Sequence, residues 1–599
     1  MEENKIAQMG VTEETVRMFS ELLERYKAGK SSTEQRIISS ENWWKLRNTT
    51  EEEKEDAIRS DGFVSRSGWL HNVIVSKHAD AVEAYPEPNI LPREIGDVDE
   101  ARQLTAIVPC VLEQNRFEQV WSDVIWQKLK TGTGVYKVVW DTGKLGGLGD
   151  IGIQRVNLLN LYWEPGITDI QKSRYLFHTE LWDKEVLLQH YPQVEEKLQD
   201  GNFVGAKFLY DDTVDDTDMV TVVDVYYRKN VEGRQVLHYC KFVGETVLYA
   251  TENDHEAVAD VNGIPRPAPA EAGLYDHGQY PYVFDVLYPI EGSPCGYGYV
   301  DLCRNPQTEI DILKTAFVKN ARVGAVPRYF SRVDGNVNEE QFLDLEQALV
   351  KVSGNVDEAT LRKIEHNTLD GNYIAMLDRT IDELRQTSGN TETSTGTPTG
   401  GVTAASAIVA LQEASGKGSR DSTLASYRAF SCIVELCIEL IRQFYGMPRQ
   451  FRITGQQGGM EFVTYTNRGL QPAEQPGFGQ EGMRLPVFDI KISAQKKNVY
   501  TKVSQNELAL QFFRLGFFAP EMASQAMLCL EMMDFDGKER ILQLLNQNAA
   551  LPMGGIPGGE AEGISQSDPF HGIARKEHAL VKKARAGAAN AAQPKGGNL

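Results

Sequence analysis

Residues 387–408, TSGNTETSTGTPTGGVTAASAI, decide how the chain is organised, because they separate two helical patterns with a polar loop. Ser388-Gly389-Asn390 ends the first pattern, since glycine and asparagine tolerate the left-handed conformation that stops helices. Residues 390–401 are rich in threonine and glycine and offer no apolar side chain to a core. A second helical pattern begins near Thr403. The stretch therefore predicts a helix, a mobile polar loop and another helix.

Upstream of this stretch, two amphipathic helices are predicted on either side of a compact insert. Their apolar stripes are Ile310, Leu313, Phe317 and Ala321 in one, and Tyr373, Met376, Leu377, Ile381 and Leu384 in the other. Asn305 followed by Pro306 is typical of an N-cap and a first helical position. Turn signals at Asp334-Gly335 and Ser353-Gly354 place the insert between the helices.

Downstream, the helix from Thr403 to about Tyr445 is predicted to kink at residues 415–419, where two glycines interrupt the periodicity. Strands are expected near residues 451–454, 461–465 and 488–492, and helices over residues 500–548. Beyond residue 551 the chain is rich in glycine and proline, then basic and alanine-rich. This end has little to bury, so we expect disorder there.

The first 290 residues combine helices and strands. Val16, Phe19, Leu23 and Tyr26 form one helical stripe, and helix is expected as far as about Lys130. Prolines between Tyr85 and Pro92 predict an extended crossing. Segments 135–140, 220–227 and 283–288 are rich in β-branched and aromatic residues, as strands are. The predicted fold class is α+β.

Composition limits what the protein can do. The 599 residues carry a formal net charge of −22, which argues against tight binding of nucleic acid, because phosphate contacts need clustered cations. The seven scattered cysteines form no C-x-x-C pair, so a disulfide framework or a zinc site is not expected. No apolar run is long enough to cross a membrane, and the N-terminus does not resemble a signal peptide.

Motifs for catalysis are missing. No G-x-x-x-x-G-K-[ST] phosphate loop, H-E-x-x-H or G-x-S-x-G is present, and Gly296-Tyr-Gly298 lacks the third glycine of a dinucleotide fingerprint. The acidic run Asp211, Asp212, Asp215, Asp216 and Asp218 leaves a metal-dependent hydrolase open as an alternative, although its spacing fits no EF-hand. We expect no enzyme activity, cofactor or metal.

The order of these elements resembles the portal, or head-to-tail connector, family of tailed phages, nearer the short-tailed type. The similarity covers most of residues 1–550. Its local marks are Asn157–Gly166 with Ser173–Phe177, Gly296–Gly298 with Pro306-Gln307, Thr387–Asn390 with Thr403–Ile408, and Asp489–Ile492 followed by Leu515-Gly516, Pro520, Leu530-Glu531 and Asp536-Gly537.

The resemblance implies a portal fold of wing, stem, clip and crown around a central channel. On this mapping the parts are an N-terminal wing (1–297), a first stem helix (298–324), a clip (325–370), a second stem helix (371–389), a tunnel loop (390–402), a long kinked helix with wing strands (403–495), crown-side helices (496–550) and a tail (551–599).

The resemblance also implies a function. Twelve copies would form a ring at the capsid vertex of the virion, assembled in the host cytoplasm, through which double-stranded DNA is packaged and ejected. Implied partners are the terminase large subunit, a head-tail adaptor, and the major capsid or scaffolding protein, with no membrane. Another virion component, an adaptor or minor capsid protein, stays open as a second alternative.

Two sets of site residues follow from the mapping. The tunnel loop facing DNA would comprise Asn390, Thr391, Glu392, Thr393, Ser394, Thr395, Gly396, Thr397, Pro398 and Thr399. The docking surface of the clip would comprise Arg328, Tyr329, Arg332, Asp334 and Asn336.

Overall fold

The computed structural model divides the chain into two units, residues 1–497 and residues 498–599. It describes residues 10–48, 65–197, 218–231, 233–256, 267–325, 329–331, 361–363, 369, 371–390, 417–454, 460–474, 483–494, 510–516, 523–531 and 541. In the second unit these include helix α15 (Ala523–Glu531), whose Ala526 and Leu530 are buried.

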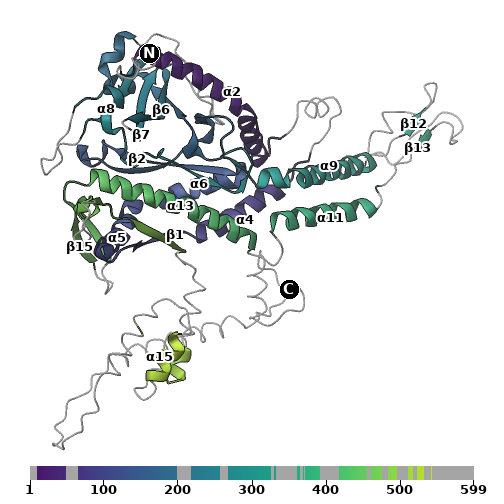
Figure 1. Ribbon diagram of the computed structural model, residues 1–599. Helices are drawn as coiled ribbons and strands as arrows, with labels where there is room; N and C mark the ends of the chain where they lie inside the picture. Colours follow the sequence, from purple (N-terminus) through teal and green to yellow (C-terminus); the bar gives the residue numbers. More distant parts are fainter. Residues whose placement is uncertain are drawn as a thin grey trace, which may run out of the picture. The chain divides into compact units, whose positions relative to one another are not determined.

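A five-stranded antiparallel sheet forms one layer of the first unit. Its strands, in spatial order, are β4 (Leu161–Trp163), β5 (Tyr175–Asp183), β6 (Met219–Val231), β7 (Arg234–Val243) and β8 (Thr246–Ala250). Helix α2 (Glu13–Trp44) packs on it through the predicted stripe, which includes Phe19 and Tyr26. The rings of Phe19 and Tyr227 lie 5.3 Å apart, and those of Tyr26 and Phe177 5.6 Å apart. These aromatic contacts join the first helix to the sheet (Figure 1).

A second sheet, of three strands, lies at the centre of the main core. β2 (Thr133–Asp141) pairs with β3 (Asp150–Arg155) on one side and with β9 (Tyr282–Val286) on the other. Helices α6 (Phe117–Thr131) and α13 (Lys417–Phe444) both contact this sheet. Phe430, Ile433, Val434, Cys437 and Ile441 of α13 are fully buried in this core.

The chain also joins residues far apart in sequence. β1 (Pro86–Pro92) pairs antiparallel with β18 (Phe488–Ala494), and α5 (Val98–Gln114) packs beside this pair. The three prolines occupy a strand that β18 borders on one side, where a missing N–H is tolerated. The predicted extended crossing is therefore confirmed as half of a two-stranded sheet.

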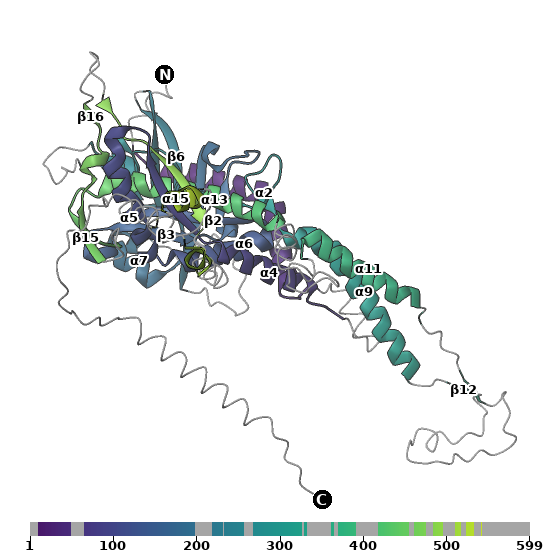
Figure 2. The ribbon, with the colours of Figure 1, turned by 90° about the horizontal axis from the view of Figure 1, so that it is seen from below.

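Helices α4 (Trp69–Glu83), α9 (Tyr299–Ala325) and α11 (Gly371–Ser388) complete the first unit. α9 and α11 contact each other and run side by side in both views (Figures 1 and 2). Between them, β12 (Tyr329–Ser331) pairs with β13 (Leu361–Lys363). The smaller elements are α7 (Lys184–His190), α8 (Pro269–Ala272), β10 (Tyr288–Pro289), β11 (Gly296–Tyr297), β14 (Arg449–Thr454), β15 (Met460–Tyr465), β16 (Ala473–Glu474) and β17 (Met483–Arg484).

The mixture of helices and strands agrees with the predicted α+β class, but the helix start inferred from Asn305-Pro306 is wrong. The helix begins at Tyr299, and Pro306 lies inside it. Asp301 accepts a hydrogen bond from the N–H of Gly298 at 3.2 Å, which is half of a capping box. Burial of Tyr299 and other early residues in the core holds this turn helical, so packing overrides the local signal of Asn305-Pro306.

Two other helical predictions changed in detail. The helix expected to reach Lys130 is two helices, α5 and α6, separated at Arg116, whose φ of 49° is left-handed. The long helix after the polar loop is described from Lys417 onward, so residues 417–419 of the expected kink belong to α13, while residues 403–416 lie outside the described residues.

Candidate functional site

The hairpin of α9 and α11 is anchored at its base by a buried polar network. Asp311 accepts hydrogen bonds from the N–H and the hydroxyl of Ser67, at 2.9 and 2.7 Å. Gln307 accepts from the N–H of Leu70 at 3.0 Å and donates to the carbonyl of Ser67 at 2.9 Å. Helix α4 begins at Trp69 with no side-chain cap of its own. α9 therefore supplies an acceptor to the first turn of α4 and accepts two bonds from Ser67, which lies just before the helix.

Farther along the hairpin, apolar side chains face solvent. The exposed fractions are 60% for Ile312, 54% for Ile374, 51% for Met376 and 44% for Tyr373. At the base, by contrast, Ile310 and Leu384 are buried. This part of the hairpin leaves much of its apolar surface in water, and such surface usually marks a protein interface. The hairpin therefore has the character of an assembly surface.

The end of α11 has the geometry that the sequence predicted. Gly389 adopts a φ of +65°, and its N–H donates to the carbonyl of Gln386 at 3.1 Å. The N–H of Asn390 donates to the carbonyl of Arg385 at 3.0 Å. This pair of bonds is a Schellman motif, which requires a left-handed residue where Gly389 stands. Asn390 itself is buried and lies against α4, with its Oδ1 3.3 Å from the Ser76 hydroxyl.

The sequence as a whole is also similar to a known family. The sequence profile of the phage P22-like portal protein family matches residues 79–591.

The chain belongs to the phage P22-like portal protein family.

The portal match runs through the hairpin and the segment after α11, and extends into the second unit. It bears out the resemblance to portals of the short-tailed type. The portal family is structural rather than enzymatic, so membership favours a portal role over the hydrolase and over an adaptor or minor capsid protein. No curated protein matches the sequence. Among the described residues, no helix is both long and apolar enough to cross a bilayer.

The portal-site residues predicted from sequence lie mostly outside the described residues. Asn390 is described, and Thr391 through Thr399 are not. Of the clip residues, Tyr329 belongs to the backbone of β12, while Arg328, Arg332, Asp334 and Asn336 lie outside the described residues. The roles of both sets stay predictions.

The acidic run considered for a metal is described only at Asp218, whose carbonyl accepts a hydrogen bond from Lys184 N–H at 3.0 Å. A different trio was missed by the sequence analysis. His178, Glu180 and Asp224 place ligand atoms within 4.8 Å of one another. The sequence does not show this trio, because His178 and Asp224 become neighbours only when β5 pairs with β6.

Lys137 already supplies a positive charge to this trio. Its Nζ lies 3.4 Å from Asp224 Oδ2, 3.7 Å from Glu180 Oε1 and 3.3 Å from His178 Nδ1. Burial disfavours the charged forms of Lys137 and Asp224. Tyr282, Asp224 and Glu180 nevertheless raise the pKa of Lys137, and Lys137 lowers the pKa of Asp224. Burial and the nearby ammonium lower the pKa of His178, which keeps it neutral. The cluster is a buried ion network in which an ammonium takes the place of a cation.

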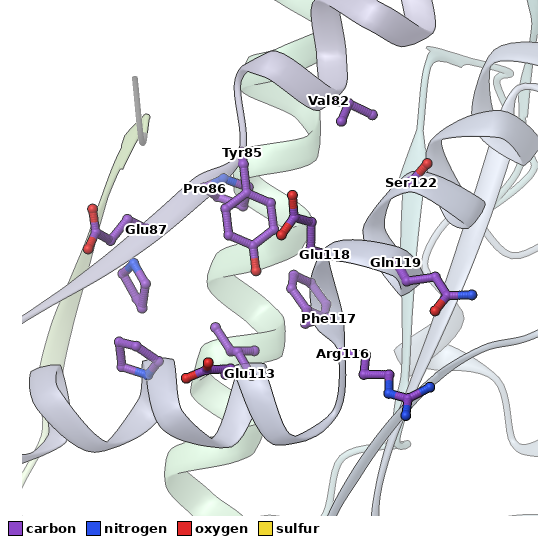
Figure 3. Close-up of a pocket in the computed structure, with 13 residues that line it drawn as sticks. Val82, Tyr85, Pro86, Glu87, Glu113, Arg116, Phe117, Glu118, Gln119 and Ser122 are labelled. Atoms are coloured by element: carbon purple, nitrogen blue, oxygen red, sulfur yellow. The ribbon is translucent and has the colours of Figure 1, made fainter. Parts of the chain in front are cut away.

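An open groove of about 800 Å³ lies where the end of α4, strand β1, the end of α5 and the start of α6 meet (Figure 3). Tyr85 and Phe117 line it with prolines, and Glu87, Glu113 and Glu118 lie around it. Burial, and then the nearby carboxylates, raises the pKa of Tyr85 to about 12, so its phenol stays protonated at neutral pH. None of the described lining residues is a histidine or a cysteine. The groove offers contact surface, and the hydroxyl of Ser122, one of its lining residues, lies 3.1 Å from His78 Nε2.

Proposed function

We propose that the chain is the subunit of a closed ring, with twelve copies surrounding a channel for DNA at the capsid vertex. The observation that carries this proposal is the apolar surface of the hairpin, exemplified by Ile312 and Ile374, which a single copy leaves exposed. In a ring each hairpin packs against the next by the same rotation, so one interface, repeated, covers every copy.

The proposed ring gives each part of the chain a place. Helices α9 and α11 form the stem, and residues 325–370, which include β12 and β13, form the clip. The clip is the docking surface for the terminase large subunit during packaging and for a head-tail adaptor afterward. The two sheets and their helices form the wing, which meets the capsid or scaffolding protein, and residues 496–550 form the crown.

The charge of the chain suits a channel through which DNA slides. A net charge of −22 disfavours a lasting grip on phosphates. Residues 390–402 are proposed as the tunnel loop that faces the duplex, with Asn390 as its anchored end, since that side chain is buried. Threonine hydroxyls can make transient phosphate contacts, and Glu392 opposes tight adhesion.

An interface variant tests the assembly. Ile374→Asp places a charge on the proposed interface, and Ile374→Leu is the matched control that keeps it apolar. Burying one such side chain contributes about 1.5–3 kcal/mol, and an unpaired charge adds a further cost, so affinity between copies should fall at least about tenfold.

Analytical ultracentrifugation of both variants gives the outcome. We expect Ile374→Asp to sediment as smaller species with an unchanged circular dichroism spectrum, and Ile374→Leu to assemble like the parent protein. Assembly of Ile374→Asp equal to that of the parent would count against a stem interface at this position.

The loop is tested separately. Deleting residues 391–400 should leave ring assembly intact and reduce the fraction of DNA retained in filled heads. Unchanged packaging and retention would remove the proposed role of the loop.

A further inference from the structure

A buried lysine interrupts the apolar face of α4. Leu70, Val73, Ile74 and Lys77 lie on one face of this helix, and Lys77 is only 5% exposed. Burial lowers the pKa of its ammonium. Placing a lysine there costs free energy unless its ammonium finds partners. Its partners therefore indicate what the residue does.

The partners of Lys77 are the two ends of the chain on either side of residues 391–416. Its Nζ donates to the carbonyl of Gly389 at 3.3 Å and to the hydroxyl of Ser419 at 3.1 Å. Gly389 directly follows α11, and Ser419 lies in the first turn of α13. One ammonium thus bonds to the last residues before the segment and the first residues after it.

Neighbouring side chains of α4 add to this contact. The Ser76 hydroxyl lies 3.3 Å from Asn390 Oδ1, on the α11 side. The Ser419 hydroxyl donates to Asp80 Oδ2 at 3.0 Å, on the α13 side. A cation at the carbonyl end of α11 is also favoured by the dipole of that helix.

Helix α4 is itself fixed to the hairpin. Leu70, in its first turn, donates to Gln307 of α9 about two turns before Lys77, and Ser67, just before the helix, donates to Asp311. Because a helix is stiff over this length, the hairpin and the two chain ends are held by one short rod.

We propose that Lys77 is a positioning residue that joins the end of α11 to the start of α13, and so fixes the positions of the residues on either side of residues 391–416. Its consequence for DNA rests on the proposed role of residues 390–402 as a tunnel loop. The joining of the two helix ends does not depend on that role.

The test compares Lys77→Met with Lys77→Arg. Methionine keeps an unbranched apolar side chain but removes the donors, whereas arginine keeps a charged donor. Ser419→Ala is a milder variant that removes the α13 contact and leaves the Gly389 contact. Hydrogen–deuterium exchange on the full-length, assembled protein reports on amides of residues 386–390 and 420–424, and DNA retention in filled heads is measured alongside.

In Lys77→Met we expect about tenfold faster exchange at both sets of amides, as the loss of one or two hydrogen bonds to a charged group implies, and reduced DNA retention. Lys77→Arg should restore both. Ser419→Ala should speed exchange in residues 420–424 only. If Lys77→Met fails to assemble, the exchange pattern of Ser419→Ala decides whether the positioning role holds.

Unchanged exchange at both sets in Lys77→Met, or equal exchange at both sets in Ser419→Ala, overturns the positioning role. The deletion of residues 391–400 separates this from the proposed function. If the deletion leaves DNA retention unchanged while Lys77→Met still speeds amide exchange, the proposed role of the tunnel loop is refuted and the positioning role is supported. If the deletion reduces DNA retention while Lys77→Met changes no amide exchange, only the positioning role is refuted.

Discussion

Replacing Lys128 by methionine should strongly destabilise the first unit, because it leaves a buried carboxylate without its cation. Lys128 Nζ lies 2.7 Å from Asp285 Oδ1, and both side chains are 0% exposed. The same ammonium donates to the Ser422 carbonyl at 2.9 Å and to the Ser426 hydroxyl at 2.6 Å, and Ser426 donates to Asp285 Oδ2 at 2.7 Å. One ion pair therefore links α6, β9 and α13.

The expected magnitude follows from this burial. Removing one partner of a buried ion pair costs about 3–5 kcal/mol, since the remaining charge stays desolvated or takes up a proton. Methionine fills most of the volume of the lysine side chain, so lost packing adds little. Replacing both partners, as Lys128→Met with Asp285→Leu, should recover most of the loss, because two apolar groups need no cation.

Urea unfolding, followed by tryptophan fluorescence, measures the free energy of unfolding for the parent, both single variants and the double variant. Arg17→Met is the control, because the ion pair of Arg17 with Glu245 is exposed and should leave the unfolding midpoint unchanged. A Lys128→Met variant within about 1 kcal/mol of the parent, or a double variant less stable than the single ones, would refute the reasoning.

Three further changes have defined outcomes. Burial, and then Arg228, lowers the pKa of His277 to about 4, below its unfolded value, so its contribution to stability is full above pH 6.5 and is lost as the pH falls toward 4. His277→Asn keeps an acceptor for the N–H of Gln279, now bound at 3.0 Å, so melting curves from pH 7 to 4 should show a smaller loss; an equal loss would contradict this. Lys137→Ala should cost about 3–5 kcal/mol in urea unfolding and should let zinc raise the melting temperature, an effect that we expect to be absent in the parent protein; absence of any zinc effect in the variant would argue against a latent cation site. Gly389→Ala should cost about 1 kcal/mol, because a φ of +65° strains alanine, and a neutral effect on the melting temperature would show that the turn adapts.

Features set by local periodicity could be predicted from the sequence. The stripe on α2, the strands β2, β6 and β9, and the end of α11 at Gly389 all follow from neighbouring residues. The resemblance to portals was also visible, because it depends on the order of such elements, and the profile match confirms it.

Features that depend on distant residues could not be predicted. The start of α9 is decided by burial of Tyr299, which no local signal at Asn305-Pro306 reveals. The network around Lys137 exists only once β2, β5 and β6 come together. Lys77 left one trace in the sequence, a charged residue on the apolar face of α4, but its partners lie more than 300 residues away.

Negative-stain imaging of the purified chain is the most direct test of the central claim. The account predicts end-on views of an annulus with an open centre and twelve-fold symmetry, formed without other virion proteins. A protein that stays a compact single copy at every concentration, with the apolar residues of α9 and α11 covered from within its own chain, would contradict it.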